Sequence, residues 1–173
     1  MPDEVNALLL RLKNGDRPAL RDLYECLNRP VYFLALSILK NKTDAEDVLQ
    51  DTFIALCTHI GKYKPGSGRS WVMTIARNKA INLVRKSRAH PTCGLDALID
   101  FADPAAAAYS DVVACALELL NVKRRQIVLL HLTLDLPHRE IAKIINMPEG
   151  SVRRNYAAAI QQIREQWKEH ELC

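Results

Sequence analysis

The 173-residue sequence lacks the features of metal sites, membrane spans and secreted scaffolds. Its five cysteines form no C-x-x-C pair and have no histidine at metal-ligand spacing, so we expect reduced thiols and no metal. Cys26, Cys57 and Cys115 stand in apolar helical settings, which favours small hydrophobic roles. No segment approaches the roughly 20 apolar residues that span a bilayer, and an N-terminus with Asp3 and Glu4 is unlike a secretory signal. These absences predict a cytoplasmic protein.

The sequence also lacks the residue sets of an enzyme. Its five histidines are scattered without a Ser-His-Asp set, and no Gly-rich phosphate loop opens a helix. We therefore expect no catalytic residue, no cofactor and no small-molecule substrate. Only six glycines interrupt a chain that is 49% hydrophobic and rich in good helix formers. This composition predicts an all-α fold.

Composition and charge divide the chain into two small helical domains. Residues 1–90 and 111–173 show helical periodicity, whereas residues 91–110 hold two prolines, three acidic residues and no basic one, as a flexible acidic linker would. The net charge of +4 is uneven, because residues 52–95 contain eight basic residues and no acidic residue. Such a block is either a tail or a surface that meets phosphate, and its helical periodicity favours the surface.

Residues 139–154 have the pattern of a helix-turn-helix. Asn146 stands at the turn, where a left-handed residue is needed, and Pro148 suits the first turn of the next helix. Apolar residues at helical spacing should face inward on both helices: Ile141, Ala142, Ile144, Ile145, Val152, Tyr156, Ala159 and Ile163. Ser151, Arg153 and Arg154 then face outward, at positions that enter the DNA major groove in this motif. A helical hairpin with a solvated basic face is the alternative.

A second feature is an acidic helix face. Thr43 is a good N-cap for this helix, with Glu46 three residues later as a capping box. The helix should bury Ala45, Val48, Leu49, Thr52, Phe53 and Leu56. Asp44, Asp47 and Asp51 share another face with Gln50 beside them. This face is either a solvated surface that complements the helix dipole or a docking surface for a protein.

A third feature is the basic helix predicted from Ser70 to about Arg88. Its core residues are Val72, Met73, Ala76, Ala80 and Leu83. The opposite side carries Asn78, Asn82 and Arg85, flanked by Lys79 and Lys86. Amide and guanidinium groups hydrogen-bond base edges, and the aromatic rings of Tyr63 and Trp71 could stack on unpaired bases. Either aromatic alone is more often part of a core, but the acid-free setting favours binding of single-stranded DNA.

These motifs together resemble the extracytoplasmic-function branch of the bacterial sigma-70 family. The resemblance rests on four segments in order: DAEDVLQDTF at 44–53, SWVMTIARN at 70–78, RKSR at 85–88, and REIA at 139–142 with PEGSVR at 148–153. It covers nearly the whole chain. It implies a promoter-specificity subunit of RNA polymerase, with sigma domain 2 in residues 1–90 and sigma domain 4 in residues 111–173.

The resemblance also implies roles for single residues. Asp47, Gln50 and Asp51 match the helix that grips the clamp coiled coil of core polymerase. The loop and helix containing Tyr63, Trp71, Asn78, Asn82, Arg85 and Lys86 match the part that melts the −10 element. The −35 element would be read through Arg139, Ser151, Arg153 and Arg154. Further implied partners are the polymerase flap, promoter DNA and an anti-sigma factor, often anchored in the membrane.

The sequence departs from the family pattern at Asn82, where Asp is common, at Asn121-Val122, where Leu-Pro is usual, and at Ala157-Ala158. A stand-alone helix-turn-helix regulator is the alternative function. It would use residues 111–173 in the same way but would leave the acidic and basic helices unexplained. Binding to core polymerase separates the two functions.

Overall fold

The computed structural model describes residues 4–89 and 117–170, which fold as α-helices with one short 3-10 helix and no strand within those ranges. The N-terminal bundle consists of α1 (Glu4–Lys13), α2 (Ala19–Leu39), α3 (Lys42–His59), the 3-10 helix η1 (Ile60–Lys62) and α4 (Gly68–Ala89). The C-terminal bundle consists of α6 (Val122–Leu134), α7 (His138–Ile145) and α8 (Glu149–His170). The all-α prediction is confirmed. The predicted linker at 91–110, with Cys93, and also Cys115 and the terminal Cys173 lie outside the described residues.

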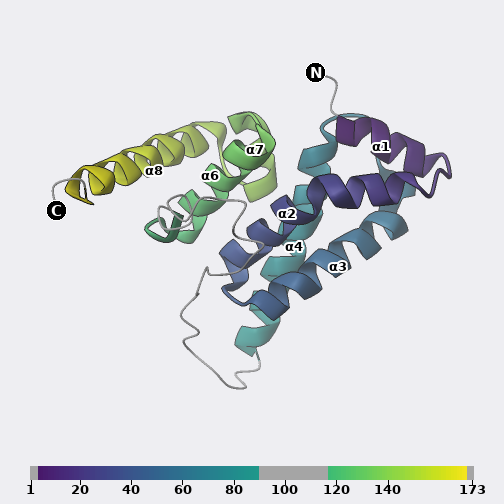
Figure 1. The fold of residues 1–173 in the computed structure, drawn as a ribbon, viewed down its shortest axis with the longest axis horizontal. Coiled ribbons are helices and arrows are strands. Elements are labelled where there is room, and N and C mark those ends of the chain that lie inside the picture. The colour runs from purple at the N-terminus through teal and green to yellow at the C-terminus, as the bar shows by residue number, and fades with distance from the viewer. Residues whose placement is uncertain (1–3, 90–116, 171–173) are drawn as a thin grey trace.

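Helices α2, α3 and α4 lie side by side in the N-terminal bundle, with α1 across one end (Figure 1). The predicted inward faces of α3 and α4 are buried, with Ala45, Val48, Val72 and Met73 at most 3% exposed. One detail of the prediction is wrong. The N-cap of α3 is Asn41, whose side chain accepts a hydrogen bond from the amide of Asp44 at 3.0 Å, so the helix starts before Thr43.

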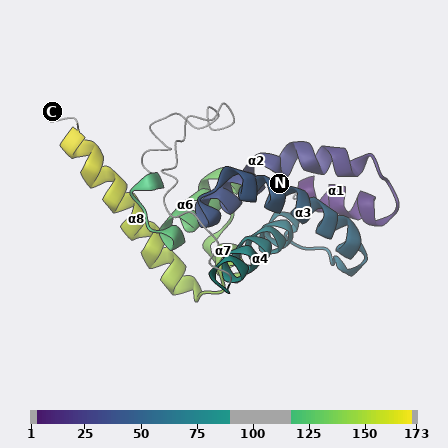
Figure 2. The ribbon, with the colours of Figure 1, turned by 90° about the horizontal axis from the view of Figure 1, so that it is seen from below.

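The C-terminal bundle contains the predicted helix-turn-helix in α7 and α8. Asn146 adopts the left-handed conformation, with φ of 53°, and its amide bonds back to the last turn of α7. Ile141, Val152 and Ala159 are fully buried, as the spacing predicts. Helix α8 extends away from the N-terminal bundle in both ribbon views (Figures 1 and 2).

The two bundles pack against each other. Helix α2 contacts α6, and α4 contacts α7, which Figure 2 shows side by side. Ile127, Leu130 and Ile141 of the C-terminal bundle belong to one continuous buried apolar cluster with Val72 and Met73 of α4. The described residues therefore form a closed arrangement in which the two domains share part of their core.

Two cysteine interpretations are corrected by the structure. Cys26 and Cys57 are exposed rather than buried, because each falls on the outer side of its helix. Because the exposed thiol of Cys26 is still partly desolvated by its neighbours and lies near the carboxylates of Glu4, Asp22 and Glu25, its pKa is raised, although Arg69 opposes this. Among the described helices, none is both long and apolar enough to cross a bilayer.

Candidate functional site

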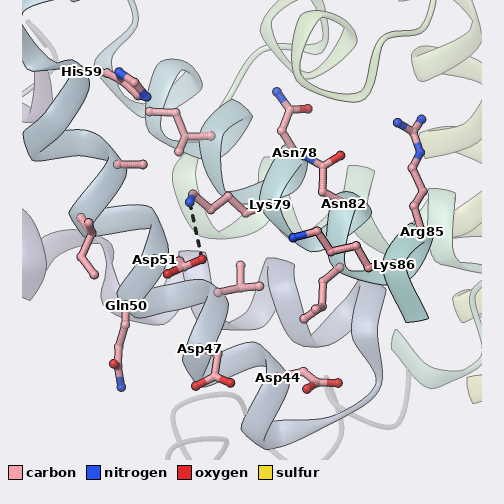
Figure 3. Close-up of a pocket in the computed structure, with 15 residues that line it drawn as sticks. Asp44, Asp47, Gln50, Asp51, His59, Asn78, Lys79, Asn82, Arg85 and Lys86 are labelled. Carbon is pink, nitrogen blue, oxygen red and sulfur yellow. Dashed lines mark hydrogen bonds and ion pairs between the residues drawn. The ribbon is translucent and has the colours of Figure 1, made fainter. Parts of the chain in front are cut away.

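A groove runs between α3 and α4, and the candidate residues of both helices line it (Figure 3). One wall is acidic and polar: Asp44, Asp47, Gln50 and Asp51 of α3. The other wall is basic and polar: Asn78, Lys79, Asn82, Arg85 and Lys86 of α4. Residues that the sequence assigns to two binding functions are therefore neighbours across one groove.

A single ion pair joins the two walls in the part of the groove that the figure labels. The ammonium of Lys79 lies 3.5 Å from a carboxylate oxygen of Asp51, and the Asp51 side chain is 62% exposed. Figure 3 shows Asn78 and Arg85 pointing away from α3, while Lys79 reaches across to it. An exposed pair of this kind contributes about 0–1 kcal/mol. The groove therefore keeps most of its polar groups free to meet other molecules.

Sequence reasoning missed Ile54, which is 63% exposed and lines the same groove. It follows Asp47, Gln50 and Asp51 at i+7, i+4 and i+3, so the acidic face of α3 ends in an apolar side chain. This spacing alone could have placed Ile54 on the acidic face of α3. A large exposed apolar residue beside charged ones is typical of a surface that binds another protein.

The structure places Tyr63 in the core and not on a surface that a base can reach. The ring is 1% exposed, its hydroxyl donates a hydrogen bond to the side-chain oxygen of Asn6, and its carbonyl accepts from Lys13 at 2.7 Å. Trp71 is half-buried, and its ring centroid lies 4.9 Å from that of Tyr63. Tyr63 thus fastens the basic loop to α1, and Trp71 of α4 packs against its ring. In this structure Tyr63 is therefore unavailable for stacking on DNA.

Gly68 shows how tightly this junction is packed. A Cβ atom at this position would lie 2.8 Å from the backbone nitrogen of Asn6 in α1. Because backbone atoms cannot move aside as a flexible side chain can, only glycine allows α4 to begin there. The close approach fixes the start of α4, and with it the positions of Asn78, Asn82 and Arg85 further along the helix.

The outward residues of the helix-turn-helix are exposed or half-buried, as the spacing predicts. Arg153 pairs with Glu149 at 3.1 Å, and Arg154 bonds the hydroxyl of Ser151 at 3.1 Å. The Arg139 side chain is 74% exposed. These contacts stay within α7 or within α8, so the guanidiniums of Arg153 and Arg154 are held at the surface without being buried.

Three rings pack together where α6, α7 and α8 meet. His131 of α6, His138 of α7 and Tyr156 of α8 contact one another, with centroid distances of 4.8–5.3 Å. The Nε2 atom of His138 is buried without a hydrogen-bond partner. Burial, followed by the charges of His131 and Arg153, holds the pKa of His138 below its ordinary value, although Glu149 opposes this. The three helices thus meet at a histidine that is stable in its neutral form.

Comparison with known protein families matches both bundles. Residues 23–90 match Sigma-70 region 2, and residues 110–163 match Sigma-70, region 4. The chain is 30% identical to RNA polymerase sigma factor CarQ of Myxococcus xanthus, over 94% of this chain and 97% of CarQ. It is 27% identical to ECF RNA polymerase sigma factor SigW of Bacillus subtilis, over 95% of this chain and 97% of SigW.

Two solved structures share the fold. CnrH in complex with the cytosolic domain of CnrY matches with a TM-score of 0.68 at 21% identity, covering 98% of this chain and 99% of CnrH. The sigma factor RpoE in complex with the anti-sigma factor NepR, from Bartonella quintana, matches with the same TM-score and identity, covering 86% of this chain and 96% of RpoE. At this identity the likeness establishes the fold alone.

Proposed function

The chain belongs to the extracytoplasmic-function branch of the sigma-70 family of RNA polymerase sigma factors, and we propose which of its surfaces bind core polymerase and which bind DNA. A sigma factor directs core polymerase to specific promoters and initiates DNA melting. In this chain sigma domain 2 would occupy residues 1–90 and sigma domain 4 residues 111–173, with the segment 91–110 joining them. A stand-alone regulator is not favoured, because both sigma regions are present in one chain.

We propose that the exposed face of α3 binds the clamp coiled coil of core polymerase. Asp47, Gln50, Asp51 and Ile54 share this face, which is the observation that carries the assignment. Ile54 supplies an apolar anchor, and the surrounding carboxylates attract basic side chains of the partner and set its register. Contact between sigma domain 4 and the polymerase flap is proposed from the family alone.

The DNA contacts follow the two basic helices. We propose that Asn78, Asn82, Arg85 and Lys86 of α4, with the half-buried Trp71, hold the melted −10 element. Arg139, Ser151, Arg153 and Arg154 would read the −35 element from α7 and α8. Tyr63 is left out of the first set because its ring is buried.

An anti-sigma factor is the remaining proposed partner. The RpoE structure contains one, and the same groove between α3 and α4 offers the charged and apolar groups that such an inhibitor would need to block polymerase binding. We propose that the protein acts in the cytoplasm, where polymerase and promoter DNA are found, and is held at the membrane when its inhibitor is anchored there.

The polymerase contact is tested by charge reversal. Asp47→Lys combined with Asp51→Lys should abolish copurification with core polymerase, because both reversed charges would face the basic groups of the partner. Folding should be unaffected, since exposed charges contribute about 0–1 kcal/mol each. Ile54→Ala should weaken binding about tenfold or more, because a buried isoleucine contributes roughly 1.5–3 kcal/mol.

The matched control is Asp22→Lys with Glu25→Lys, which makes the same charge change on α2, away from the groove. Each variant is compared with the wild type by far-UV circular dichroism and by pull-down on core polymerase. Wild-type binding in a folded Asp47 and Asp51 double variant would show that polymerase docks elsewhere.

A further inference from the structure

Hydrogen bonds from the basic helix α4 to the C-terminal bundle add to the shared apolar cluster in holding the closed arrangement. An Nη atom of Arg69 donates to the backbone carbonyl of Leu134 at 3.0 Å. The Nε atom of Arg77 donates to the side-chain oxygen of Gln126 at 3.2 Å, and Gln126 is only 5% exposed. Both acceptors lie on α6, so two arginines of one helix hold two points of another.

A third contact reaches α7. The carboxylate of Glu140 accepts a hydrogen bond from Lys143 at 2.9 Å, and the hydroxyl of Ser70 at the start of α4 lies close enough to help lower its pKa. The Glu140 side chain is only 12% exposed. Burial by itself raises the pKa of this carboxyl, but Lys143, the Ser70 hydroxyl and the charge of Arg139 together outweigh it and hold the pKa below its ordinary value. The carboxylate is therefore stabilised in its charged form at the contact with α4.

The positive charge of Arg77 is not neutralised in this arrangement by any described residue. Among the described residues no carboxylate pairs with it, and its acceptor is a neutral amide. Burial lowers the pKa of its guanidinium, which means that the charged form has lost hydration without gaining an anion. A phosphate would supply that anion, and the planar guanidinium can donate two parallel hydrogen bonds to its oxygens.

We propose that this interdomain contact is an autoinhibitory latch, in which α6 and α7 hold Arg69 and Arg77 of the melting helix away from DNA. Opening of the latch releases both guanidiniums to the phosphates of the non-template strand. The inference rests on the proposed function for the identity of the ligand. It also explains why the two arginines, which belong to the acid-free basic block, do not face the groove with Arg85 and Lys86.

The latch is tested on the full-length chain with changes confined to the C-terminal bundle. Gln126→Ala removes the acceptor of Arg77, Glu140→Gln replaces a charged acceptor with a neutral one, and α4 is left unaltered. The matched control makes the same two changes on α8, where Gln161 bonds only Glu165 in the exposed pair: Gln161→Ala with Glu165→Gln. Small-angle scattering should show a radius of gyration about a tenth larger for the latch variant, because separated domains no longer form one compact body.

The DNA arm uses a fluorescent, mixed-sequence single-stranded oligonucleotide of about 20 nucleotides, a length that exceeds common site sizes. The latch variant should bind it about threefold more tightly than the wild type. Adding Arg77→Ala to the latch variant should cancel that gain and lower the salt slope by about one, as loss of a phosphate contact does. Equal binding of this triple variant and the latch variant would exclude Arg77 as a DNA contact and overturn the proposal.

If the domain 4 changes unfold the C-terminal bundle, Arg77→Met opens the latch from the other side, because it keeps the aliphatic stem and removes the hydrogen bond. A folded Arg77→Met chain should also expand. A folded variant that keeps the wild-type radius overturns the proposal, and so does an expanded latch variant with wild-type DNA affinity. The radius is measured without polymerase, so loss of the proposed polymerase contact leaves this result unaffected and can be recognised separately.

Discussion

Arg125 holds the start of the C-terminal bundle together. It is only 7% exposed, and its guanidinium donates hydrogen bonds to the carbonyls of Leu117 at 2.8 Å, Glu118 at 3.0 Å and Leu120 at 3.1 Å. Burial lowers its pKa, and the nearby Glu118 opposes that shift. One side chain therefore supplies the donors for three carbonyls that precede α6. Its removal should destabilise the C-terminal bundle that positions α8.

The expected loss of stability is worked out for Arg125→Met, which removes the three hydrogen bonds and keeps the aliphatic stem. A hydrogen bond to a charged donor contributes about 1.5–3 kcal/mol, which sets an upper limit of roughly 4.5–9 kcal/mol. Loss of the buried charge returns its desolvation cost of several kcal/mol, so we expect a net loss of about 3 kcal/mol in the free energy of unfolding. For a chain of this length, that loss lowers Tm by roughly 6–12 °C.

Thermal and urea unfolding, followed by far-UV circular dichroism near neutral pH, measure the loss. Arg164→Met is the control, because Arg164 is exposed on α8 and its replacement should change stability by about 0.5 kcal/mol or less. Hydrogen exchange should show a larger loss of protection in α6–α8 than in α3. A loss below about 1 kcal/mol for Arg125→Met, or an equal loss for Arg164→Met, would refute this account of the bundle.

Three further predictions concern DNA opening, promoter reading and pH. Asn78→Ala with Arg85→Ala should leave promoter binding by holoenzyme intact but remove permanganate-reactive thymines near the start site; wild-type reactivity would assign melting to another face. Arg153→Ala or Arg154→Ala should reduce base discrimination at one upstream position by about 1–3 kcal/mol, whereas Arg139→Ala should weaken all sequences alike. Binding to a promoter library with a randomised upstream element measures both effects, and unchanged preference in the two α8 variants would remove α8 as the reader. Because the pKa of His138 is lowered in the folded state, stability should be full above the ordinary value of 6.5 and fall as pH drops below it. Urea unfolding of wild type and His138→Gln across that range tests this, and parallel pH profiles would contradict it.

The sequence predicts the helices and their buried faces because these depend on local spacing. Val48, Val72 and Val152 lie where the 3.6-residue period places them, and all are at most 3% exposed. Asn146 was likewise predictable, since few residues tolerate the left-handed conformation that the turn requires. Ile54 could also be predicted from local spacing, because its distance in sequence from Asp47 places it on the acidic face.

Other features depend on contacts that local spacing does not encode. Thr43 and Asn41 are both good caps, and only the path of the chain out of α2 selects Asn41. Tyr63 stands in a basic glycine-rich loop that resembles a DNA-binding segment, yet its ring is buried through its contact with Asn6 of α1. Arg125 follows Lys123 and Arg124 in a run that reads as a solvated surface. In each case a partner distant in sequence or outside the helical period decides the outcome.

The interface between the bundles is the feature that local spacing encodes least. The chemistry of its contacts indicates how the two bundles could separate reversibly. The hydrogen bond from the charged guanidinium of Arg77 to the neutral Gln126 contributes about 1.5–3 kcal/mol, but a phosphate would also neutralise the charge and could accept two parallel hydrogen bonds. The second hydrogen bond and the charge neutralisation favour a phosphate over Gln126 as the partner of Arg77. The shared apolar cluster, which includes Ile127 and Met73, favours the closed state when DNA is absent. In the proposed latch the apolar cluster and the neutral acceptors of Arg69 and Arg77 thus hold the closed state without DNA, and an anionic phosphate competes with those acceptors for the two guanidiniums.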